Sequence, residues 1–242
     1  MSYIFREHIK QSLAVIAFLM TLTACTSESY DAGDGPNSYL TADLVLLHTS
    51  QDKSVRSALL DDGTTLQFSN PFAQDWLTRP DSVYRALLYY DKTVAASDAA
   101  ASNPTATSIV RARSVRPVSV LRPVEAEDME TLRTDPVGFE SLWMSKNKSY
   151  INLSLLLKSG KTEADDALHA LGIVSHGTTT DADRRRTLHL TLYHDQGGVP
   201  AYYTVQQYVS IPTQLLEEAD TVELTLNTYN GKKVVKVAVS NL

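Results

Sequence analysis

The stretch TVELTLNTYNGKKVVKVAV, residues 221–239, decides the fold class of this chain. Apolar side chains occupy alternate positions on both sides of Asn230-Gly231: Val222, Leu224 and Leu226 precede it, and Val235, Val237 and Val239 follow it. A period of two indicates a β-strand with one buried face. An Asn-Gly pair between two such strands is typical of a type I′ turn, in which both residues have positive φ. The chain is therefore predicted to end in an antiparallel hairpin.

The same alternation continues upstream of this hairpin. Apolar residues share one face within three further runs, at residues 151–157, 188–192 and 203–211. In the first run, Asn152 and Ser154 point to the opposite face, because successive side chains of a strand alternate. Repeated strands of this kind, separated by turns, predict an antiparallel β-sandwich over residues 136–242, with inner faces about 10 Å apart.

Residues 40–124 form a shorter β unit of a different kind. Strand-like runs occupy residues 42–48, 55–60, 65–69, 83–94 and 108–124. Gly63 tolerates the positive φ of a tight turn between the second run and the third. About five strands in this length fit a small barrel of the OB type, and a partly open SH3-like barrel is the alternative. Residues 125–135 are acidic and polar, and we place a linker between two domains there.

Residues 1–24 are predicted to be a signal peptide. A basic head with Arg6 and Lys10 precedes an apolar run, residues 12–22, which is too short to span a hydrocarbon core of about 30 Å. The only cysteine, Cys25, follows this run and resembles the acylated cysteine of a bacterial lipobox. A plain secretory signal and a cytosolic protein with a buried thiol are the alternatives. Residues 25–39, rich in Ser, Gly and Asp, are expected to be a flexible tether.

The charge and cysteine content limit the partners of this protein. The chain carries 22 basic and 28 acidic residues, a formal net charge of −6. An acidic balance argues against binding of nucleic acid. With one cysteine, the chain has no CxxC or Cys/His cluster and offers no zinc site with several cysteine ligands. We therefore predict no metal, no cofactor and no nucleic-acid partner.

Together these features resemble the NigD-like lipoproteins of the Bacteroidetes. The resemblance is carried by the lipobox, by DPVGFESLWMSKNKSYINLSLLLKSG at residues 135–160 and by LHLTLYHD at residues 188–195. That family pairs an N-terminal OB-type domain with a C-terminal β-sandwich. Its founding members lie beside a bacteriocin locus, so the resemblance implies an immunity-like role. The lipidated Cys25 is the one functional residue that the resemblance implies.

The sequence contains no recognised catalytic motif. A GxSxG nucleophile elbow is absent. The consecutive pairs Asp61-Asp62 and Asp165-Asp166 diverge in a turn or helix, whereas glycoside hydrolysis needs two carboxylates about 5 to 9.5 Å apart across a cleft. His194 lies near a predicted strand end before a glycine loop, but no metal-ligand pattern accompanies it. We therefore predict no catalytic residues and no enzymatic activity.

The candidates for a ligand or partner surface are Arg111, Arg113, Tyr202 and Tyr208. Arg111 and Arg113 share a face of a predicted strand, as positions two apart do. They suit acidic lipid headgroups or an anionic glycan, and a solvated face is the alternative. Tyr202 and Tyr208 also share a face, and with Trp143 they are aromatic candidates for stacking on sugar rings. The alternative is that these rings only stabilise the sheet.

These observations favour a lipid-anchored protein of the cell envelope that acts as a non-catalytic binding module. We expect Cys25 to anchor it in the outer membrane, on the periplasmic or the surface face. The expected partner, besides the membrane, is an unknown envelope protein such as a toxin, or a glycan. A glycan-binding accessory lipoprotein is the main alternative function, and a hydrolase is the weaker one.

Overall fold

The computed structural model describes residues 40–92, 108–161, 168–216 and 219–239. The predicted signal peptide, Cys25 and the tether lie outside the described residues. Within the described ranges the regular elements are β-strands, apart from two 3₁₀ turns, η3 (Ala126–Asp128) and η4 (Thr213–Leu215). None of the described helices is long and apolar enough to cross a membrane. The predicted all-β class is confirmed.

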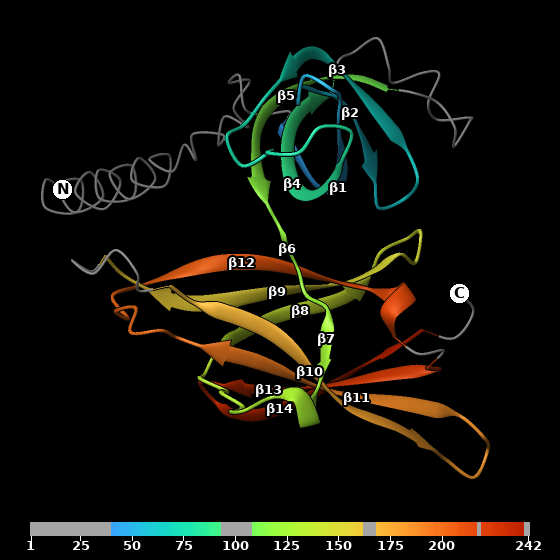
Figure 1. Cartoon of the computed structure of the whole chain (residues 1–242), viewed down its shortest axis with the longest axis vertical. Coiled ribbons are helices and arrows are strands. Elements are labelled where there is room, and N and C mark those ends of the chain that lie inside the picture. Colours follow the sequence, from blue (N-terminus) through green and yellow to red (C-terminus); the bar gives the residue numbers. More distant parts are fainter. Residues whose placement is uncertain (1–39, 93–107, 162–167, 217–218, 240–242) are drawn as a thin grey trace, which may run out of the picture. The chain divides into compact units, whose positions relative to one another are not determined.

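The first five strands close into a barrel (Figure 1). They are β1 (Leu40–Thr49), β2 (Val55–Leu60), β3 (Thr65–Phe72), β4 (Val83–Lys92) and β5 (Ser108–Pro117). Around the barrel their order is β1-β2-β3-β5-β4, and β4 pairs back onto β1. Strands β3 and β5 run parallel, and the other neighbours run antiparallel. A closed five-stranded barrel agrees with the OB-type unit expected from the sequence.

The remaining strands form a β-sandwich of two sheets. The strands are β6 (Ser119–Val120), β7 (Pro123–Glu125), β8 (Gly138–Met144), β9 (Tyr150–Ser159), β10 (Ala170–Thr180), β11 (Arg186–Asp195), β12 (Tyr203–Pro212), β13 (Thr221–Thr228) and β14 (Gly231–Ala238). One sheet has the order β14-β13-β11-β10-β7 and the other β6-β12-β9-β8. The predicted sandwich is therefore confirmed.

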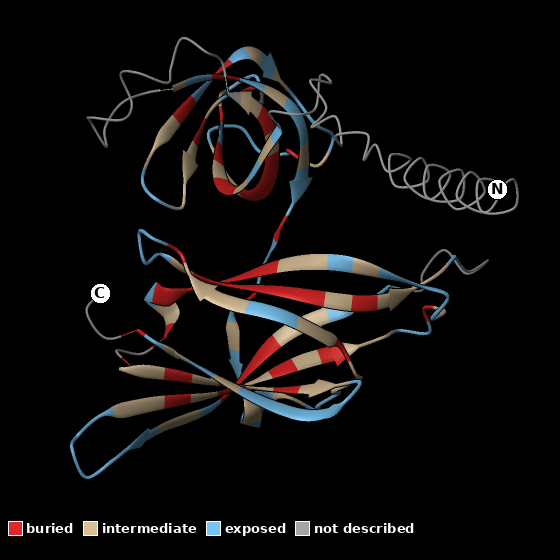
Figure 2. Cartoon of the chain, turned by 180° about the vertical axis from the view of Figure 1, so that it is seen from behind, coloured by how far each residue is buried: buried red, intermediate tan, exposed pale blue. Residues whose placement is uncertain are grey.

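Each domain has its own apolar core, built by the period-two pattern. Figure 2 shows buried positions alternating with intermediate or exposed positions along several strands. The barrel core includes Val45, Leu47, Leu66, Ala86 and Leu88. The sandwich core contains the apolar sets expected from the sequence: Ile151, Leu153, Leu155 and Leu157; Leu188, Leu190 and Leu192; and Val222, Leu224 and Leu226. Burial of this surface is the main stabilising contribution in both domains.

The sandwich sheets are mixed, whereas the sequence predicts antiparallel sheets. Strands β11 and β13 run parallel, as do the pairs β7–β10 and β6–β12. The chain leaves β11 for β12 in the other sheet before it returns as β13, so β11 and β13 enter their sheet in the same direction. Alternation assigns the faces of a strand but carries no information about its neighbour, so the pairing direction was not visible in the sequence.

The chain enters the sandwich before residue 124, where the sequence places the end of the barrel. Strand β5 ends at Pro117, and β6 and β7 then pair with sandwich strands β12 and β10. Residues 119–125 therefore extend the sandwich sheets. These strands contain two and three residues, too few to display an alternation that distinguishes one domain from the other.

The C-terminal hairpin is confirmed, but its turn is not type I′. Thr228 pairs with Gly231, so the turn residues are Tyr229 and Asn230, and of the residues 228–231 only Gly231 has a positive φ, of 101°. The Thr228 hydroxyl accepts the Asn230 N–H at 3.2 Å and donates to the Gly231 carbonyl at 2.6 Å. These two bonds hold the turn one residue earlier than the Asn-Gly pair suggests, and Gly231 takes the left-handed position that follows it.

We expect Gly231→Ala to lower the free energy of unfolding by about 1 to 2 kcal/mol, because an L-residue is strained at this φ. A Cβ at Gly231 would meet no atom within 4 Å, so the loss would come from the backbone alone. Gly172→Ala is the matched control, since its Cβ would lie 3.5 Å from the Tyr193 Cβ, an ordinary contact, in a strand without positive φ. Urea unfolding of both variants tests this, and equal losses would contradict it.

Candidate functional site

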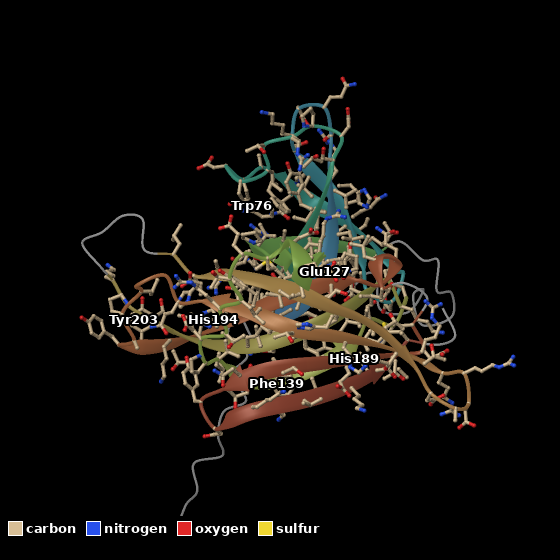
Figure 3. The ribbon with its side chains drawn as sticks, turned by 60° about the horizontal axis from the view of Figure 1, so that its bottom comes forward. Trp76, Glu127, Phe139, His189, His194 and Tyr203 are labelled. Carbon is tan, nitrogen blue, oxygen red and sulfur yellow. The ribbon has the colours of Figure 1, made fainter. Side chains whose placement is uncertain are left out.

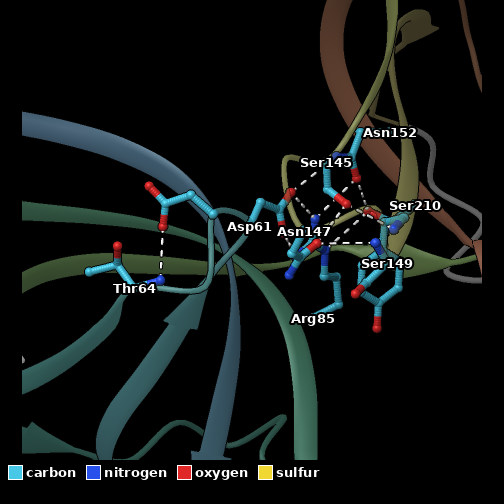
Figure 4. A network of polar contacts seen from close by, with 10 residues as sticks. Asp61, Thr64, Arg85, Ser145, Asn147, Ser149, Asn152 and Ser210 are labelled. Carbon is cyan, nitrogen blue, oxygen red and sulfur yellow. Dashed lines mark hydrogen bonds and ion pairs between the residues drawn. The ribbon is translucent and has the colours of Figure 1, made fainter. Parts of the chain in front are cut away.

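Arg85 on β4 joins the barrel to the sandwich (Figure 4). Its guanidinium donates from Nη1 and Nη2 to the two carboxylate oxygens of Asp61, at 2.5 and 2.7 Å. On the sandwich side, the Ser210 hydroxyl accepts from Nε at 3.1 Å and Asn152 Oδ1 accepts from Nη2 at 3.0 Å. The guanidinium Cζ also lies 4.4 Å from the centre of the Tyr150 ring. The two domains thus share one buried charge, whose side chain is 1% exposed.

Two further hydrogen bonds close this network. The Ser210 hydroxyl donates to Asn152 Oδ1 at 2.7 Å, and Asn152 Nδ2 donates to Asp61 Oδ2 at 3.1 Å. Asn152 and Ser210 are fully buried, although both lie on the polar faces of their strands. A buried guanidinium is tolerated where a bidentate carboxylate and neutral acceptors replace its hydration, as they do around Arg85.

An apolar cluster lies at the same domain contact. Leu44, Leu87 and Val118 are buried there, and the rings of Tyr89, Trp143 and Tyr208 pack against them. The rings of Trp143 on β8 and Tyr208 on β12 meet edge to face, with centroids 6.3 Å apart and an interplanar angle of 83°. Edge-to-face pairs at such distances are favourable. The contact between the domains therefore combines a polar network with a small apolar core.

A cleft of about 430 Å³ opens beside this contact, between barrel and sandwich residues. This volume falls within the range of about 300 to 1,000 Å³ that is usual for ligand pockets. Its apolar wall includes Tyr89, Trp143 and Tyr208. Its polar lining includes the carboxylates Asp43, Asp62 and Glu140, the ammonium of Lys146 and the side chains of Ser154 and Gln206.

Two of these carboxylates accept hydrogen bonds from neutral side chains. Asp43 accepts the Tyr90 hydroxyl at 2.8 Å, and burial and this carboxylate raise the pKa of the Tyr90 phenol above its usual value. Glu140 accepts the Ser154 hydroxyl at 2.6 Å and the Gln206 amide at 2.5 Å. These two bonds lower the pKa of Glu140, so its side chain is charged at neutral pH.

The third carboxylate, Asp62, lies in the turn between β2 and β3. Burial by itself would raise the pKa of Asp62. The hydrogen bond from the Thr64 backbone N–H, at 2.9 Å, and the charge of Lys146 lower that pKa, and the net shift is downward. Asp62 and Glu140 are therefore both ionised at neutral pH.

The structure separates the two predicted tyrosines. Tyr208 is half-buried and lines the cleft. Tyr202 precedes β12 and is 80% exposed, and its neighbour Tyr203 is also exposed, near one end of the sandwich (Figure 3). Six positions of extended chain separate Tyr202 from Tyr208, a distance of about 20 Å at the usual rise per residue. Tyr202 is not among the residues that line the cleft.

The two predicted arginines lie on β5 and are exposed. Arg113 donates from Nε to Asp91 Oδ2 at 2.5 Å, so its charge is paired across the strands. Arg111 lies directly opposite Asp91 in the β4–β5 register. Neither arginine lines the cleft. The structure therefore does not bring the arginines together with Tyr208 in one site.

No pattern in the sequence marks Glu140, Gln206 or Asp43 as site residues. Glu140 and Gln206 are single polar residues on the outer faces of strands, where polar residues are ordinary. Trp143 and Tyr208 are the sequence candidates that line the cleft, both named as aromatic side chains suited to stacking on a ligand. The residues that face each other across the cleft come from distant parts of the chain, which no local pattern reveals.

His194 is a structural residue. It is 1% exposed, and its Nδ1 lies 2.9 Å from the Asp135 carbonyl oxygen, so this nitrogen carries the donated proton. Its Nε2 lies 3.0 Å from His169 Nδ1, and the two rings stack. Burial, and then the neighbouring His194, lower the pKa of His169. Within the described ranges, no group of three His, Cys, Asp or Glu residues is placed to hold a metal ion.

Comparison with known proteins finds a matching family model and several similar structures. Residues 120–239 match the family model of the NigD-like C-terminal beta sandwich domain. A NigD-like immunity protein from Bacteroides caccae is 23% identical with a TM-score of 0.58, covering 81% of this chain and 91% of that chain. A protein of unknown function from Bacteroides vulgatus is 16% identical with a TM-score of 0.56, covering 82% and 90%.

A third similar structure is a protein from Bacteroides fragilis that is classed provisionally as a lipoprotein. It is 12% identical with a TM-score of 0.57, covering 83% of this chain and 98% of that chain. At these identities the likeness to solved structures establishes a shared fold. No curated protein matches the chain.

Removal of the shared guanidinium tests the domain contact. We expect Arg85→Ala to lower the free energy of unfolding by about 3 kcal/mol or more, because Asp61 then keeps a partly buried charge without its partner. Arg56→Ala is the control: that side chain is 66% exposed and lies 3.9 Å from Asp52. We expect its loss to stay below about 1 kcal/mol. Urea unfolding followed by circular dichroism measures the free energy of unfolding of both variants. Similar losses would contradict the role of Arg85 in the domain contact.

Proposed function

We propose a function for this chain from one premise: it belongs to the NigD-like family, whose C-terminal β-sandwich domain it carries at residues 120–239. The protein acts as a lipid-anchored, non-catalytic binding module of the cell envelope. Its partner binds in the cleft between barrel and sandwich. The half-buried rings of Trp143 and Tyr208 beside ionised carboxylates in that cleft are the observation that carries the proposal.

The construction of the cleft supports binding. Its walls belong to two sheet domains that Arg85 and the apolar cluster hold together, so its shape exists before a partner arrives. A preformed site avoids the ordering cost that a flexible surface pays on association. Trp and Tyr are also the side chains that most often dominate the energy of protein interfaces.

The state of the acidic residues supports a non-catalytic role. Glycoside hydrolysis needs one carboxylic acid whose pKa is raised so that it can donate a proton at neutral pH. In this cleft the pKa values of Glu140 and Asp62 are both lowered, by hydrogen bonds that favour the charged form. These two side chains therefore suit electrostatic recognition better than proton donation.

Cys25 supplies the membrane anchor in this proposal. The residues before it form the pattern of a lipoprotein signal, and the provisional classing of the Bacteroides fragilis protein as a lipoprotein supports an envelope location. Acyl chains on the cysteine would hold the protein at the outer membrane, facing the periplasm or the cell surface.

The proposed partner is a protein, as it would be for an immunity factor that binds a toxin. One of the similar structures is named a NigD-like immunity protein, which supports this choice. The second candidate is a glycan, because aromatic rings lie beside carboxylate and amide groups in the cleft. Sugar recognition uses the same combination of ring faces and hydrogen-bonding groups.

Replacement of the cysteine tests the anchor. We expect the full-length protein to fractionate with the outer membrane and the Cys25→Ala variant to appear in the aqueous fraction, because position 25 then has no thiol to which lipid can be attached. Immunoblots of separated membranes from the native cells measure this. Retention of the variant in the same membrane fraction would contradict anchoring through Cys25.

Loss of cleft rings tests the binding site. We expect cross-linking in cells followed by capture of the full-length protein to recover one protein partner. Trp143→Ala and Tyr208→Ala should each reduce its recovery about fivefold or more, as removal of a central aromatic contact does. Tyr202→Ala is the matched control, because Tyr202 is 80% exposed outside the cleft. Thermal unfolding of each purified variant confirms that the folded state is retained.

Two results would overturn this assignment. If all three variants recover the partner equally, the cleft is not the binding site. If polysaccharide is enriched without a protein, and the cleft variants abolish that enrichment, the glycan candidate replaces the protein partner.

A further inference from the structure

We propose that the cleft recognises a cationic side chain, the lysine or arginine of a partner protein, between the carboxylates of Asp43 and Glu140 and against the ring of Trp143. This inference rests on the proposed binding function and adds the chemistry of the partner. It follows from the charge of the cleft, from the state of its acids and from the aromatic wall beside them.

The cleft carries more negative than positive charge. Its described lining contains the four carboxylates of Asp43, Asp61, Asp62 and Glu140 and one cation, the ammonium of Lys146. Asp61 is paired with the buried Arg85, and Lys146 is close enough to Asp62 to lower its pKa. The hydrogen bonds described for Asp43 and Glu140 come from neutral groups.

Both of these carboxylates retain capacity to bind a cation. Asp43 accepts one hydrogen bond, from Tyr90 through Oδ2, and Glu140 accepts two bonds through Oε2. An ionised carboxylate offers about four acceptor positions, so each has positions left for an ammonium or guanidinium. Ser154 and Gln206 also hold Glu140 in place, which reduces the side-chain entropy that a new ion pair would otherwise cost.

The aromatic wall suits the rest of such a side chain. Lysine and arginine have long aliphatic stems that pack on apolar surface while the charged end reaches a polar group. Trp143 and Tyr208 form a fixed edge-to-face pair, and Tyr89 lines the same cleft. The face of an aromatic ring also attracts a cation, and tryptophan does so most strongly. An arginine or lysine would therefore satisfy both walls, whereas an acidic group would be repelled.

Apart from Arg6 and Lys10 in the predicted signal peptide, the segments outside the described residues contain no lysine or arginine that could supply the cation. Residues 26–39 contain Glu28, Asp31 and Asp34 but no lysine or arginine. Residues 93–107 contain Asp98 and likewise no basic residue. Charge complementarity thus assigns the cleft to a basic group of another molecule. A neutral glycan lacks that group, which is why we prefer a protein.

The fluorescence of Trp143 reports occupancy of the cleft. The chain has two tryptophans, and Trp76→Phe leaves Trp143 as the only tryptophan, which can be excited selectively over tyrosine, while keeping a ring against Tyr84. In this background, the full-length protein in neutral detergent is titrated with hexalysine at low salt. We expect a saturable change in emission that added salt weakens. Hexaglutamate and the neutral sugar maltohexaose should cause no change.

A matched pair of charge variants locates the binding. We expect Asp43→Asn combined with Glu140→Gln to weaken hexalysine binding about tenfold, since two ion pairs are lost. Asp75→Asn combined with Glu127→Gln removes the same charge from exposed residues outside the cleft, and we expect a change below about twofold because long-range charge effects are screened.

Three results overturn the proposal. The first is that hexalysine does not alter Trp143 emission. The second is that both variant pairs weaken binding equally, which would mean general attraction to an acidic protein. The third is that maltohexaose binds in place of hexalysine, which would favour a glycan. The cell-based capture separates this failure from failure of the binding function. If the Asp43→Asn, Glu140→Gln variant recovers the partner as well as the native chain does, while Trp143→Ala does not, the binding module stands and cationic recognition falls.

Discussion

The burial of one guanidinium, that of Arg85, is the constraint on which the two-domain structure depends. Its carboxylate partner, Asp61, belongs to the barrel, and its other acceptors, Asn152 and Ser210, belong to the sandwich. A guanidinium removed from water needs hydrogen-bond partners in place of its hydration, so the domain contact is favourable only in the arrangement that brings Asp61, Asn152 and Ser210 to Arg85. The arrangement of the domains is therefore specified by hydrogen bonds, and the apolar cluster beside them adds burial.

This constraint also explains why a cleft exists at the contact. The outer face of the sheet that contains β9 and β12 carries Asn152, Ser154, Gln206 and Ser210 next to the rings of Trp143 and Tyr208. Asn152 and Ser210 are buried, whereas Glu140 and Gln206, bonded to Ser154 at the same face, remain exposed. At the edge of the buried contact, charged and polar side chains therefore lie next to an apolar wall. That combination allows a single side chain of a partner to gain both a charge contact and apolar burial.

The two domains and their order can be predicted from the sequence because period two and turn residues are local properties of a chain. Two of the corrections have local causes, and the third does not. Asn230-Gly231 suggested a type I′ turn, but the Thr228 hydroxyl holds the turn one residue earlier. Strands of two and three residues, β6 and β7, were too short to carry a pattern, so the domain boundary lies before residue 119. Parallel pairing of β11 and β13 depends on the path of β12 between them.

The sequence by itself determined the all-β class, the sandwich core and the face on which each side chain of a strand lies, because alternation follows from backbone geometry. Only the tertiary structure decided which polar face is buried and which side chains meet. Arg85 reaches Asn152 and Ser210 across 67 and 125 positions of chain. Alternation predicts Tyr202 and Tyr208 on one face of a strand, yet Tyr202 precedes β12 and only Tyr208 lines the cleft. The reason is that burial of a sheet face depends on which part of the chain packs on it, and strand periodicity does not specify that part.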